Sequence, residues 1–522
     1  MPSFPPTTAF EQRPSHQLTK VFSASVVGIE AEIVEVEVDV SPGLPNVIIV
    51  GLPDIAVKEA RERVKSAIKN SHSVFPTSRV AVNLAPADLP KNGTHFDLPI
   101  AISILANSGQ LKFDSERMVF LGELSLDGKV RGVSGVLSTA LSAKQRGFMS
   151  VMVPEDNAAE ATLVGGLEVI PVKSLQEAVA HLQNLRPIQP AVRAMAKKAR
   201  LHGNGLDMRD IKGQEQAKRA LEIAAAGSHN ILMIGPPGSG KTILARTFPT
   251  ILPQLSEEEM LEVTKIYSVA GALSGRRELI TTRPFRSPHH TASAVSLVGG
   301  GSIPRPGEIS LAHRGVLFLD ELPEFNQSVL ESLRQPMEDG IVTIARASGA
   351  MTFPARFTLV AAQNPCPCGY YNDPDRPCTC SPGQIQRYNK KVSGPLLDRI
   401  DLCVQVPRIS YDKITKEAGV ERSADLQNRV EDARSRQTQR FSLGETASRT
   451  NAEMGIRELK QYSRLNEESH SLLKTAIETL HLSTRSYSRI LKIARTIADL
   501  SGEANIRTAD LAEALLYRPG QE

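Results

Sequence analysis

One stretch of eight residues has the composition and spacing needed to hold a polyphosphate. Its members are Gly235, Pro236, Pro237, Gly238, Ser239, Gly240, Lys241 and Thr242, which fit G-x-x-x-x-G-K-[ST] at every fixed position. The glycines let successive backbone N–H groups turn inward around phosphate oxygens. Lys241 is expected to reach the β- and γ-phosphates, and Thr242 to hold Mg²⁺. The stretch therefore predicts a binding loop for ATP and Mg²⁺.

The residues on either side of this loop place it between a strand and a helix. The apolar run 231–234 precedes it, and a helical stretch begins at residue 243. A helix that starts here adds its positive N-terminal end to the phosphate site. A plain Gly/Pro turn is the alternative, but a full match in this setting favours phosphate binding.

A pair of carboxylates supplies the second half of the expected chemistry. Asp320 and Glu321 directly follow the apolar run 316–319, which is typical of a strand buried on both faces. Asp320 is expected to order Mg²⁺ through water, and Glu321 to polarise the attacking water. A chance Asp-Glu pair after a strand is the alternative, and the phosphate loop makes it much less favoured.

Four of the five cysteines are concentrated in one short Pro/Gly-rich segment. They form two C-x-C pairs, Cys366 with Cys368 and Cys378 with Cys380. Four thiols at this spacing are able to converge on a tetrahedral metal ion, so structural Zn²⁺ is favoured over reduced cysteines without metal. Cys403 stands alone in a strand-like run and is predicted to lie in the core.

The whole chain has the length and composition of a multidomain soluble protein. Its 522 residues suggest about three folding units. No apolar run approaches the roughly 20 residues that span a bilayer, and the N-terminus lacks the order of a signal peptide, so a cytoplasmic location without a membrane partner is expected. The net charge of +4 is too small to indicate a polyanion partner by itself, so any contact with nucleic acid must be local.

The chain divides into four predicted segments of an α/β protein. Residues 30–40 alternate apolar and polar side chains as a half-buried strand does, and they belong to an α+β domain over 1–182. The segment 183–208 contains prolines, glycines and a basic cluster, which is typical of an exposed linker. A core with a parallel sheet is expected over 209–407, and helical periodicity dominates 408–522.

The core resembles a large family of ring ATPases. Residues 210–221, taken with the phosphate loop, resemble AAA+ ATPases. The resemblance implies that Asn364, which ends the apolar strand 357–363, senses the γ-phosphate. It also implies that Arg399, in the box 394–402, is an arginine finger for the neighbouring subunit, since a planar and always charged guanidinium fits phosphoryl oxygens.

Arginines in the C-terminal segment complete this resemblance. The helical segment resembles the lid of an AAA+ module, and the family pattern places a second sensing arginine at Arg485, with Arg489 one turn further as the reserve candidate. A solvated arginine on an exposed helix face is the alternative for either one. For Arg399 the alternative is an ion pair within the subunit, with Asp398 or Asp401.

The N-terminal segment resembles a protease domain that has lost its chemistry. Residues 91–98 and 122–135 resemble the parts of the Lon protease domain that carry its catalytic serine and lysine. Here the serine's place falls near His95 and the lysine's near Leu137. Because a leucine cannot activate a nucleophile, the resemblance implies a Lon-protease-like domain without peptidase activity.

A long insertion and a hairpin resemble one branch of the AAA+ proteins. Segments within 255–311 resemble magnesium-chelatase-like AAA+ proteins. The insertion contains His289 and His290, for which a metal site is not favoured because no carboxylate stands at a matching spacing. Residues 341–356 predict a hairpin. In related ring helicases such hairpins project into the pore, where Arg346 would meet a phosphate backbone, and a surface salt bridge is the equal alternative.

Over essentially its full length the sequence is similar to the bacterial YifB/ComM family. That resemblance implies a homo-hexameric, ATP-driven DNA motor that promotes branch migration when incoming DNA is integrated during natural transformation. Its partner would be single-stranded or branched DNA, bound without sequence preference. A ring that remodels a protein partner, as the magnesium chelatase motor subunit does, is the alternative.

Overall fold

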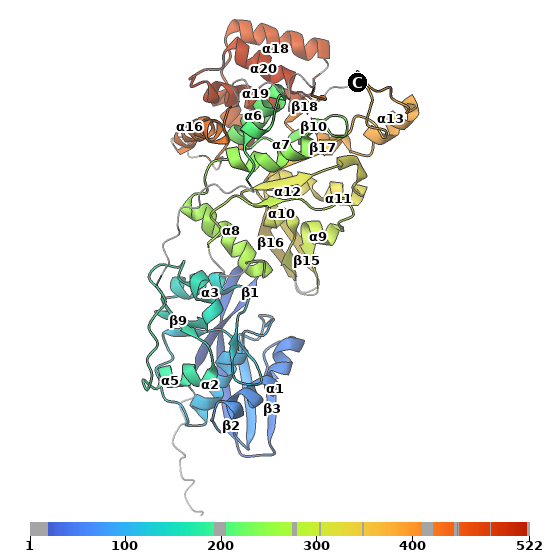
Figure 1. Ribbon diagram of the computed structural model, residues 1–522. Coiled ribbons are helices and arrows are strands. Elements are labelled where there is room, and N and C mark those ends of the chain that lie inside the picture. Colours follow the sequence, from blue (N-terminus) through green and yellow to red (C-terminus); the bar gives the residue numbers. More distant parts are fainter. Residues whose placement is uncertain are drawn as a thin grey trace, which may run out of the picture. The chain divides into compact units, whose positions relative to one another are not determined.

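The computed structural model describes residues 19–192, 205–273, 279–301, 304–346, 349–409, 421–442, 446, 448–480 and 482–518 (Figure 1). The chain divides into two compact units. The first comprises Met1–Ala194 with Gly271–Glu278, and the second Met195–Ala270 with Leu279–Glu522. The basic cluster predicted for the linker, residues 193–200, lies outside the described residues.

A mixed sheet forms the centre of the first unit. Its strand order is β3-β4-β2-β1-β5-β8-β9, with antiparallel pairing of β1 with β2 and of β2 with β4, and parallel pairing elsewhere. The strands are β1 (Val21–Val27), β2 (Glu30–Ser41), β3 (Asn46–Val50), β4 (Arg79–Ala85), β5 (Met118–Phe120), β8 (Ser150–Pro154) and β9 (Glu168–Val172). Alternate side chains of β2 (Val34, Val36 and Val38) are fully buried, which confirms the period-two prediction.

Helices and a short hairpin complete the first unit. The helices are α1 (Ile55–Asn70), α2 (Asp97–Asn107), α3 (Val136–Gln145), α4 (Ala158–Ala161) and α5 (Leu175–Leu182), and the hairpin strands are β6 (Glu123–Leu124) and β7 (Val130–Arg131). The two positions that mark the protease resemblance are both enclosed. The ring of His95 lies 2.8 Å from the carbonyl of Ala24, and burial lowers the pKa of His95 to about 4. Leu137 is fully buried in α3.

The second unit is organised on a five-stranded parallel sheet. Its strand order is β11-β14-β17-β10-β18. The strands are β10 (Ile231–Ile234), β11 (Phe285–Arg286), β14 (Val316–Leu319), β17 (Thr358–Gln363) and β18 (Leu402–Gln405). Continuous apolar runs make up β10, β14 and most of β17, because both faces of a parallel sheet are covered. The predicted α/β core with a parallel sheet is therefore confirmed.

Helices and smaller hairpins surround this sheet. The helices before the C-terminal segment are α6 (Glu215–Gly227), α7 (Lys241–Thr247), α8 (Glu257–Ala270), α9 (Ala294–Val298), α10 (Glu308–Leu311), α11 (Gln327–Ser332), α12 (Arg334–Asp339), α13 (Pro382–Asn389) and α14 (Gly394–Leu397). Two antiparallel pairs are added, β12 (Gly299–Gly300) with β13 (Arg305–Pro306) and β15 (Ile341–Arg346) with β16 (Gly349–Pro354). The second pair is the hairpin predicted over 341–356, and the residues at its tip lie outside the described ranges.

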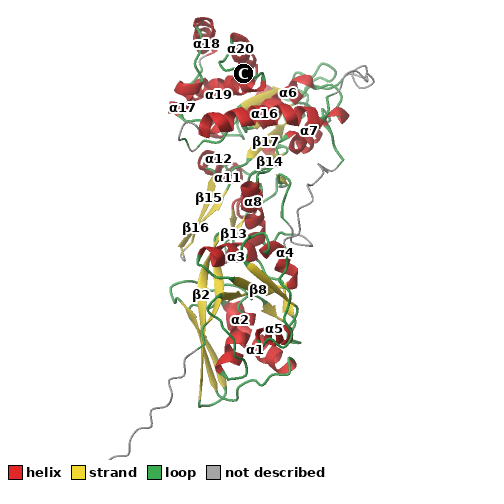
Figure 2. Cartoon of the chain, turned by 90° about the vertical axis from the view of Figure 1, so that its left-hand side faces the viewer, coloured by secondary structure: helices red, strands yellow, loops and turns green. Residues whose placement is uncertain are grey.

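The C-terminal segment is helical, as predicted. It contains α16 (Ser423–Ser442), α17 (Ile456–Tyr462), α18 (Glu467–Leu480), α19 (Thr484–Leu500) and α20 (Thr508–Leu516). Both α16 and α19 pack against α6, beside the parallel strands (Figure 2). One hydrophobic core runs through the sheet and these helices, from Met208 to Tyr517. The C-terminal helices are therefore built into the second unit.

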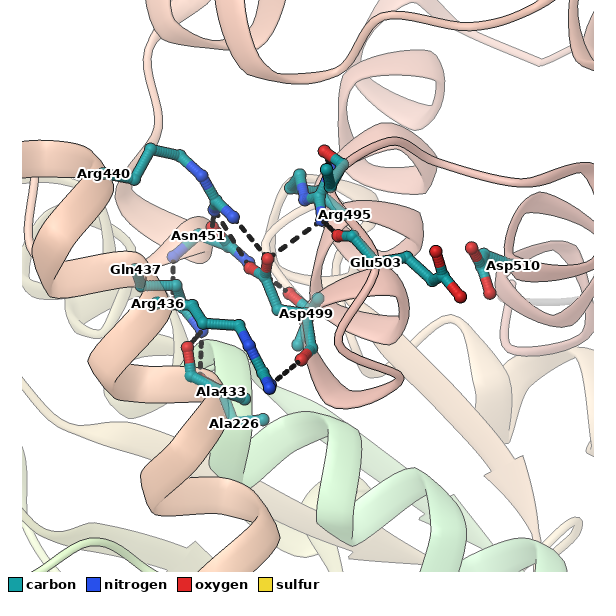
Figure 3. A network of polar contacts seen from close by, with 12 residues as sticks. Ala226, Ala433, Arg436, Gln437, Arg440, Asn451, Arg495, Asp499, Glu503 and Asp510 are labelled. Carbon is teal, nitrogen blue, oxygen red and sulfur yellow. Dashed lines mark hydrogen bonds and ion pairs between the residues drawn. The ribbon is translucent and has the colours of Figure 1, made fainter.

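A buried polar network fastens the C-terminal helices to one another (Figure 3). The carboxylate of Asp499 has no exposed surface and pairs with two arginines, Arg440 and Arg495. Asn451 donates to the same carboxylate at 2.8 Å. The network continues to the end of α6, because the ring of His229 lies 2.8 Å from the Thr496 hydroxyl on α19. A fully paired buried carboxylate favours one arrangement of these helices.

Candidate active site

The predicted phosphate loop lies between β10 and α7, at the carboxyl end of the central part of the sheet. Gly238 and Gly240 have φ of 76° and 97°, a left-handed region that disfavours side chains. At Gly235 there is no room for a side chain, since a Cβ would lie 2.1 Å from the carbonyl oxygen of Val406. The strand, loop and helix follow one another as the motif requires.

Lys241 connects the phosphate loop to the end of β17. Its ammonium donates hydrogen bonds to the carbonyls of Gly235 at 2.6 Å and Pro236 at 2.9 Å. A third bond, of 3.2 Å, reaches the side-chain oxygen of Asn364. Burial lowers the pKa of Lys241, against the opposing attraction of nearby carboxylates. The structure thus brings the predicted sensor residue into direct contact with the predicted phosphate-binding lysine.

The carboxylate pair lies beside the same loop. The hydroxyl of Thr242 donates to Asp320 at 2.8 Å. The backbone N–H of Glu321 donates to Asp320 at 3.0 Å, and Glu321 itself has a left-handed backbone, with φ of 54°. A hydroxyl and a carboxylate in contact are the two protein ligand types that Mg²⁺ takes in P-loop proteins. Thr242 and Asp320 therefore have the chemistry and the proximity to hold it.

A histidine that the sequence had not assigned to this site also contacts it. Nδ1 of His290 lies 3.5 Å from Oε2 of Glu321. His290 follows β11 and Glu321 follows β14. Because these two strands pair in parallel, both residues lie at the carboxyl end of the sheet. In the sequence, the two adjacent histidines suggested only a metal site, which was not favoured. The available signal was their position shortly after a strand, which becomes informative once the strand order is known.

Arg399 lies at the other end of the sheet. Asn230, which immediately precedes β10, donates from its side chain to the carbonyl of Arg399 at 3.0 Å. The phosphate loop immediately follows β10, so a whole strand, about 13 Å long, separates the two positions. The guanidinium of Arg399 pairs with Glu338 on α12 and donates to the carbonyl of Pro395 at 2.7 Å. Its ion pair within the chain is thus made with a carboxylate other than the two neighbours considered in the sequence.

The two candidate lid arginines lie at this same end. Arg485 is exposed, with Nη1 3.7 Å from the carboxylate of Asp398, and buried Arg489 donates to the carbonyl of Asp398 at 2.6 Å. A cleft of about 990 Å³ is lined by Arg399 and Arg485, together with Lys492. Among the described residues, the lining of this cleft includes none from the phosphate loop. The structure therefore groups the two predicted arginines with each other and apart from their own phosphate loop.

The four clustered cysteines lie next to Asn364. Their sulfur atoms lie within 4.8 Å of one another, and no other group of histidine, cysteine and acidic side chains in the described ranges converges in this way. All are free thiols, and so is Cys403, which is buried in β18 as predicted. The cluster could hold a metal ion of tetrahedral preference such as Zn²⁺.

The fold and these groups define the class of protein. A phosphate loop after β10, an acidic pair after β14 and an amide after β17 make a nucleotide-binding module of the magnesium-chelatase-like AAA+ class, whose members use ATP and Mg²⁺. Three family models agree: magnesium chelatase subunit ChlI over residues 207–414, subunit ChlI of Mg-chelatase over 36–157, and the ChlI C-terminal model over 420–518.

Comparison with individual proteins gives the family. Competence protein ComM of Haemophilus influenzae is 44% identical over 511 residues, which cover 96% of this chain and 97% of that protein. The protein YifB of Escherichia coli is 44% identical over 506 residues, with 96% and 97% covered. The chain belongs to the ComM/YifB family of magnesium-chelatase-like proteins. The magnesium-chelatase 67 kDa subunit of Chlorobaculum parvum is 30% identical over 160 residues, or 30% of this chain and 23% of that protein.

These findings confirm the predicted family, the parallel α/β core and the helical C-terminal region. The Lon-like fold of the first unit, the boundaries at 182, 208 and 407, and the roles assigned to individual site residues stay predictions.

In the part of the chain that the structure describes, the helices are too short or too polar to cross a membrane.

Proposed function

We propose that the chain is an ATPase that works as a homo-hexameric ring and moves DNA, as a helicase and branch-migration translocase in recombination during natural transformation. The observation that carries the ring is the separation of Arg399 from its own phosphate loop by the full length of β10. An arginine finger must reach the transferred phosphoryl group. Arg399 therefore serves a neighbouring chain, and a site is complete only where two chains meet.

The residues at the carboxyl end of the sheet divide the chemistry among them. Lys241 binds the β- and γ-phosphates, and Thr242 and Asp320 hold Mg²⁺, which neutralises charge on the phosphate oxygens. Glu321 polarises the attacking water. Asn364 supports this, because it already contacts Lys241 at 3.2 Å and is within reach of the γ-phosphate or its water.

The arginine cleft supplies the other half of each site. Arg399 would stabilise the charge that develops on the phosphoryl oxygens of the neighbour's ATP. Arg485 lines the same cleft and is exposed, so it is placed to contact the same neighbour, whereas Arg489 is already engaged by a backbone carbonyl. Arg485 lies on α19, which also contacts α6. A displacement of Arg485 by the neighbour would therefore be transmitted through these helices to the nucleotide-binding core of its own chain.

DNA as the partner is supported by the family and by one element. The H. influenzae relative is named a competence protein. The hairpin of β15 and β16 is a two-stranded arm outside the five-stranded sheet, and Arg346 is the last residue of β15. An arm of this kind could place a cation against a phosphate backbone in a ring's pore, bound without regard to sequence.

Remodelling of a protein partner is the second candidate. It is favoured by the match to a magnesium-chelatase subunit and by the magnesium-chelatase models that cover both units. In that case the first unit, whose buried His95 and Leu137 have no peptidase role, would be a Lon-like docking module. The same ATPase mechanism serves both candidates.

ATP hydrolysis measured with and without DNA separates the two candidates. Single-stranded and forked DNA should stimulate turnover, and the purified protein should bind DNA with affinity that falls as salt is raised. It should also migrate a synthetic branched junction when ATP is present. If DNA does not change the rate of ATP hydrolysis and the protein shows no salt-sensitive DNA binding, the DNA motor is rejected and the remodelling ring remains.

A further inference from the structure

The cysteine loop contacts the phosphate loop directly. Gly369, in the loop that follows Cys366 and Cys368, has φ of 86°, and a Cβ built on it would lie 2.5 Å from Cδ of Pro237. The same Cβ would lie 3.9 Å from the side-chain carbon of Asn364. The backbone of the cysteine loop therefore rests on the phosphate loop at a point where only glycine fits.

The sulfur atoms are arranged for one metal ion. The Sγ atoms of Cys366, Cys368 and Cys378 are separated by 3.3, 3.7 and 3.6 Å. A tetrahedral Zn²⁺ with Zn–S bonds of about 2.3 Å sets its sulfurs about 3.8 Å apart. A disulfide would require about 2.05 Å, and a polynuclear iron–sulfur cluster would need room for several metal ions between the thiolates.

The backbone around the sulfurs is arranged to support thiolates. The N–H groups of Cys368, Tyr371 and Cys380 donate to Sγ atoms of the cluster at 3.4, 3.3 and 3.4 Å. Such donors stabilise the negative charge of metal-bound thiolate and fix its direction.

The loop between the cysteine pairs is anchored to the sheet as well. Asp373, whose side chain is 1% exposed, pairs with Arg408 at 3.0 Å, and the guanidinium of Arg408 lies 5.3 Å from the ring centre of Tyr370. Arg408 follows β18, the strand beside β10. The loop is thus attached at the phosphate loop, at Asn364 and beyond β18.

We propose that the four cysteines bind one Zn²⁺ and that this metal, by holding Gly369 against Pro237, keeps the phosphate loop in its ATP-binding shape. The proposal rests on the proposed function, in that the loop must bind ATP. Without the metal, the segment 366–380 would be held by hydrogen bonds within the loop and by the ion pair of Asp373 with Arg408, and no ligand would join the two cysteine pairs. The metal therefore controls nucleotide affinity from outside the set of residues that touch the nucleotide.

Metal analysis of the purified full chain is the first test. One zinc per chain is expected. The double variant Cys378→Ser/Cys380→Ser should lose the zinc and bind a fluorescent ATP analogue about tenfold more weakly, because a shift of about 1 Å in a binding group is costly. Cys403→Ala, which removes the fifth cysteine, should keep both the zinc and the affinity.

Two glycine variants test the contact with all cysteines intact, so they are informative even if the cysteine variant fails to fold. Gly369→Ala should keep its zinc and bind the analogue about tenfold more weakly. Gly383→Ala is the matched control, because a Cβ there meets nothing within 4 Å and the residue lies at the start of α13. It should change neither quantity.

The possible failures are distinguishable. Iron, or no metal, in the wild-type chain would overturn the zinc site. Zinc-free protein, or Gly369→Ala, with wild-type nucleotide affinity would overturn the link to the phosphate loop. A wild-type chain that binds zinc but no ATP would reject the proposed function and the link together, and would leave the metal site standing.

Discussion

The two ends of the five-stranded sheet hold the predicted phosphate-contacting cations, Lys241 and Arg399, in opposite ways. At the carboxyl end, Lys241 is buried and its ammonium bonds to two carbonyls and an amide, so burial lowers its pKa. At the amino end, Arg399 is paired with Glu338, and Arg314 with Glu262 at 2.8 Å. A buried ammonium that bonds only to neutral oxygens is suited to bind an anion. A guanidinium that is paired with a carboxylate must exchange that partner before it can bind one.

The difference supports the proposal that each chain carries two halves of different sites. Because the strands are parallel, everything that follows a strand meets at one edge and everything that precedes one meets at the other. The acidic pair, the phosphate loop and Asn364 follow strands. Arg399 and the residues around it precede β18. The separation is thus a direct result of strand direction, and in the proposed ring a neighbouring chain would bring the halves together.

Mixing two inactive variants tests this division most strongly. Arg399→Ala should lower turnover by about 10³-fold, as removal of an arginine finger does, and Glu321→Gln should bind ATP without hydrolysing it. When the two variants are mixed and allowed to exchange subunits, about a quarter of the interfaces join an intact Glu321 to an intact Arg399. Steady-state ATPase assays of the mixtures should therefore recover measurable turnover.

The control for this experiment is a single chain that carries both substitutions. When it is mixed with either single variant, no interface joins an intact Glu321 to an intact Arg399, so turnover should not recover. Absence of recovery in the first mixture, with exchange confirmed by labelled subunits, would mean that Arg399 does not act on a neighbour.

Replacing the buried cation tests the carboxyl end alone. Lys241→Ala removes the ammonium that the phosphates would contact, and nucleotide affinity should fall by about 100-fold, or about 3 kcal/mol. Equilibrium titration with a fluorescent ATP analogue measures it. Lys460→Ala, at an exposed position on α17, is the matched control and should bind normally. Near-normal affinity of Lys241→Ala would place the phosphates elsewhere.

The positions of the residues at the carboxyl end could be predicted from the sequence because the information for them is local. Residues 235–242 form one contiguous motif, and Asp320 and Asn364 each directly follow an apolar strand. The contacts at the amino end depend instead on how elements far apart in the sequence pack together. That Arg399 pairs with Glu338, and that Arg485 lies beside Asp398, follows from the packing of α12 and α19 on a sheet whose strand order no single segment specifies. His290 was missed for the same reason.

His290 provides a smaller test within the carboxyl end. Its ring is 3.5 Å from Glu321, so in the proposed mechanism it would position the carboxylate that polarises water. His290→Ala should lower kcat by about tenfold with little change in KM, because the nucleotide contacts remain. His289→Ala is the control, since the ring of His289 bonds to the hydroxyl of Thr291. Partial recovery with His290→Gln is also expected. Equal effects of the two alanine variants would remove His290 from the site.

The amino end predicts a modest acid sensitivity of its own. A hydrogen bond from His313, followed by one from Arg314, lowers the pKa of Glu262 to about 2. Burial lowers the pKa of His313, whose neutral ring accepts from the Arg356 N–H through Nδ1 and donates through Nε2. Because the carboxyl pKa is depressed by folding, its contribution is present above the unfolded value of about 4.3 and is lost as the pH falls toward 2.

Since 39% of this side chain is exposed, solvent screening limits the contribution to about 1 kcal/mol. Glu262→Gln should therefore lower the urea midpoint of the second unit at pH 7, and the difference from wild type should shrink as the pH falls below about 4.3. Glu258→Gln, exposed on the same helix, should show no such trend. If the difference in urea midpoint between Glu262→Gln and wild type stays constant from pH 7 to pH 3, Glu262 contributes through packing alone. The ion pair of Arg314 with Glu262 would then not distinguish the amino end from the carboxyl end.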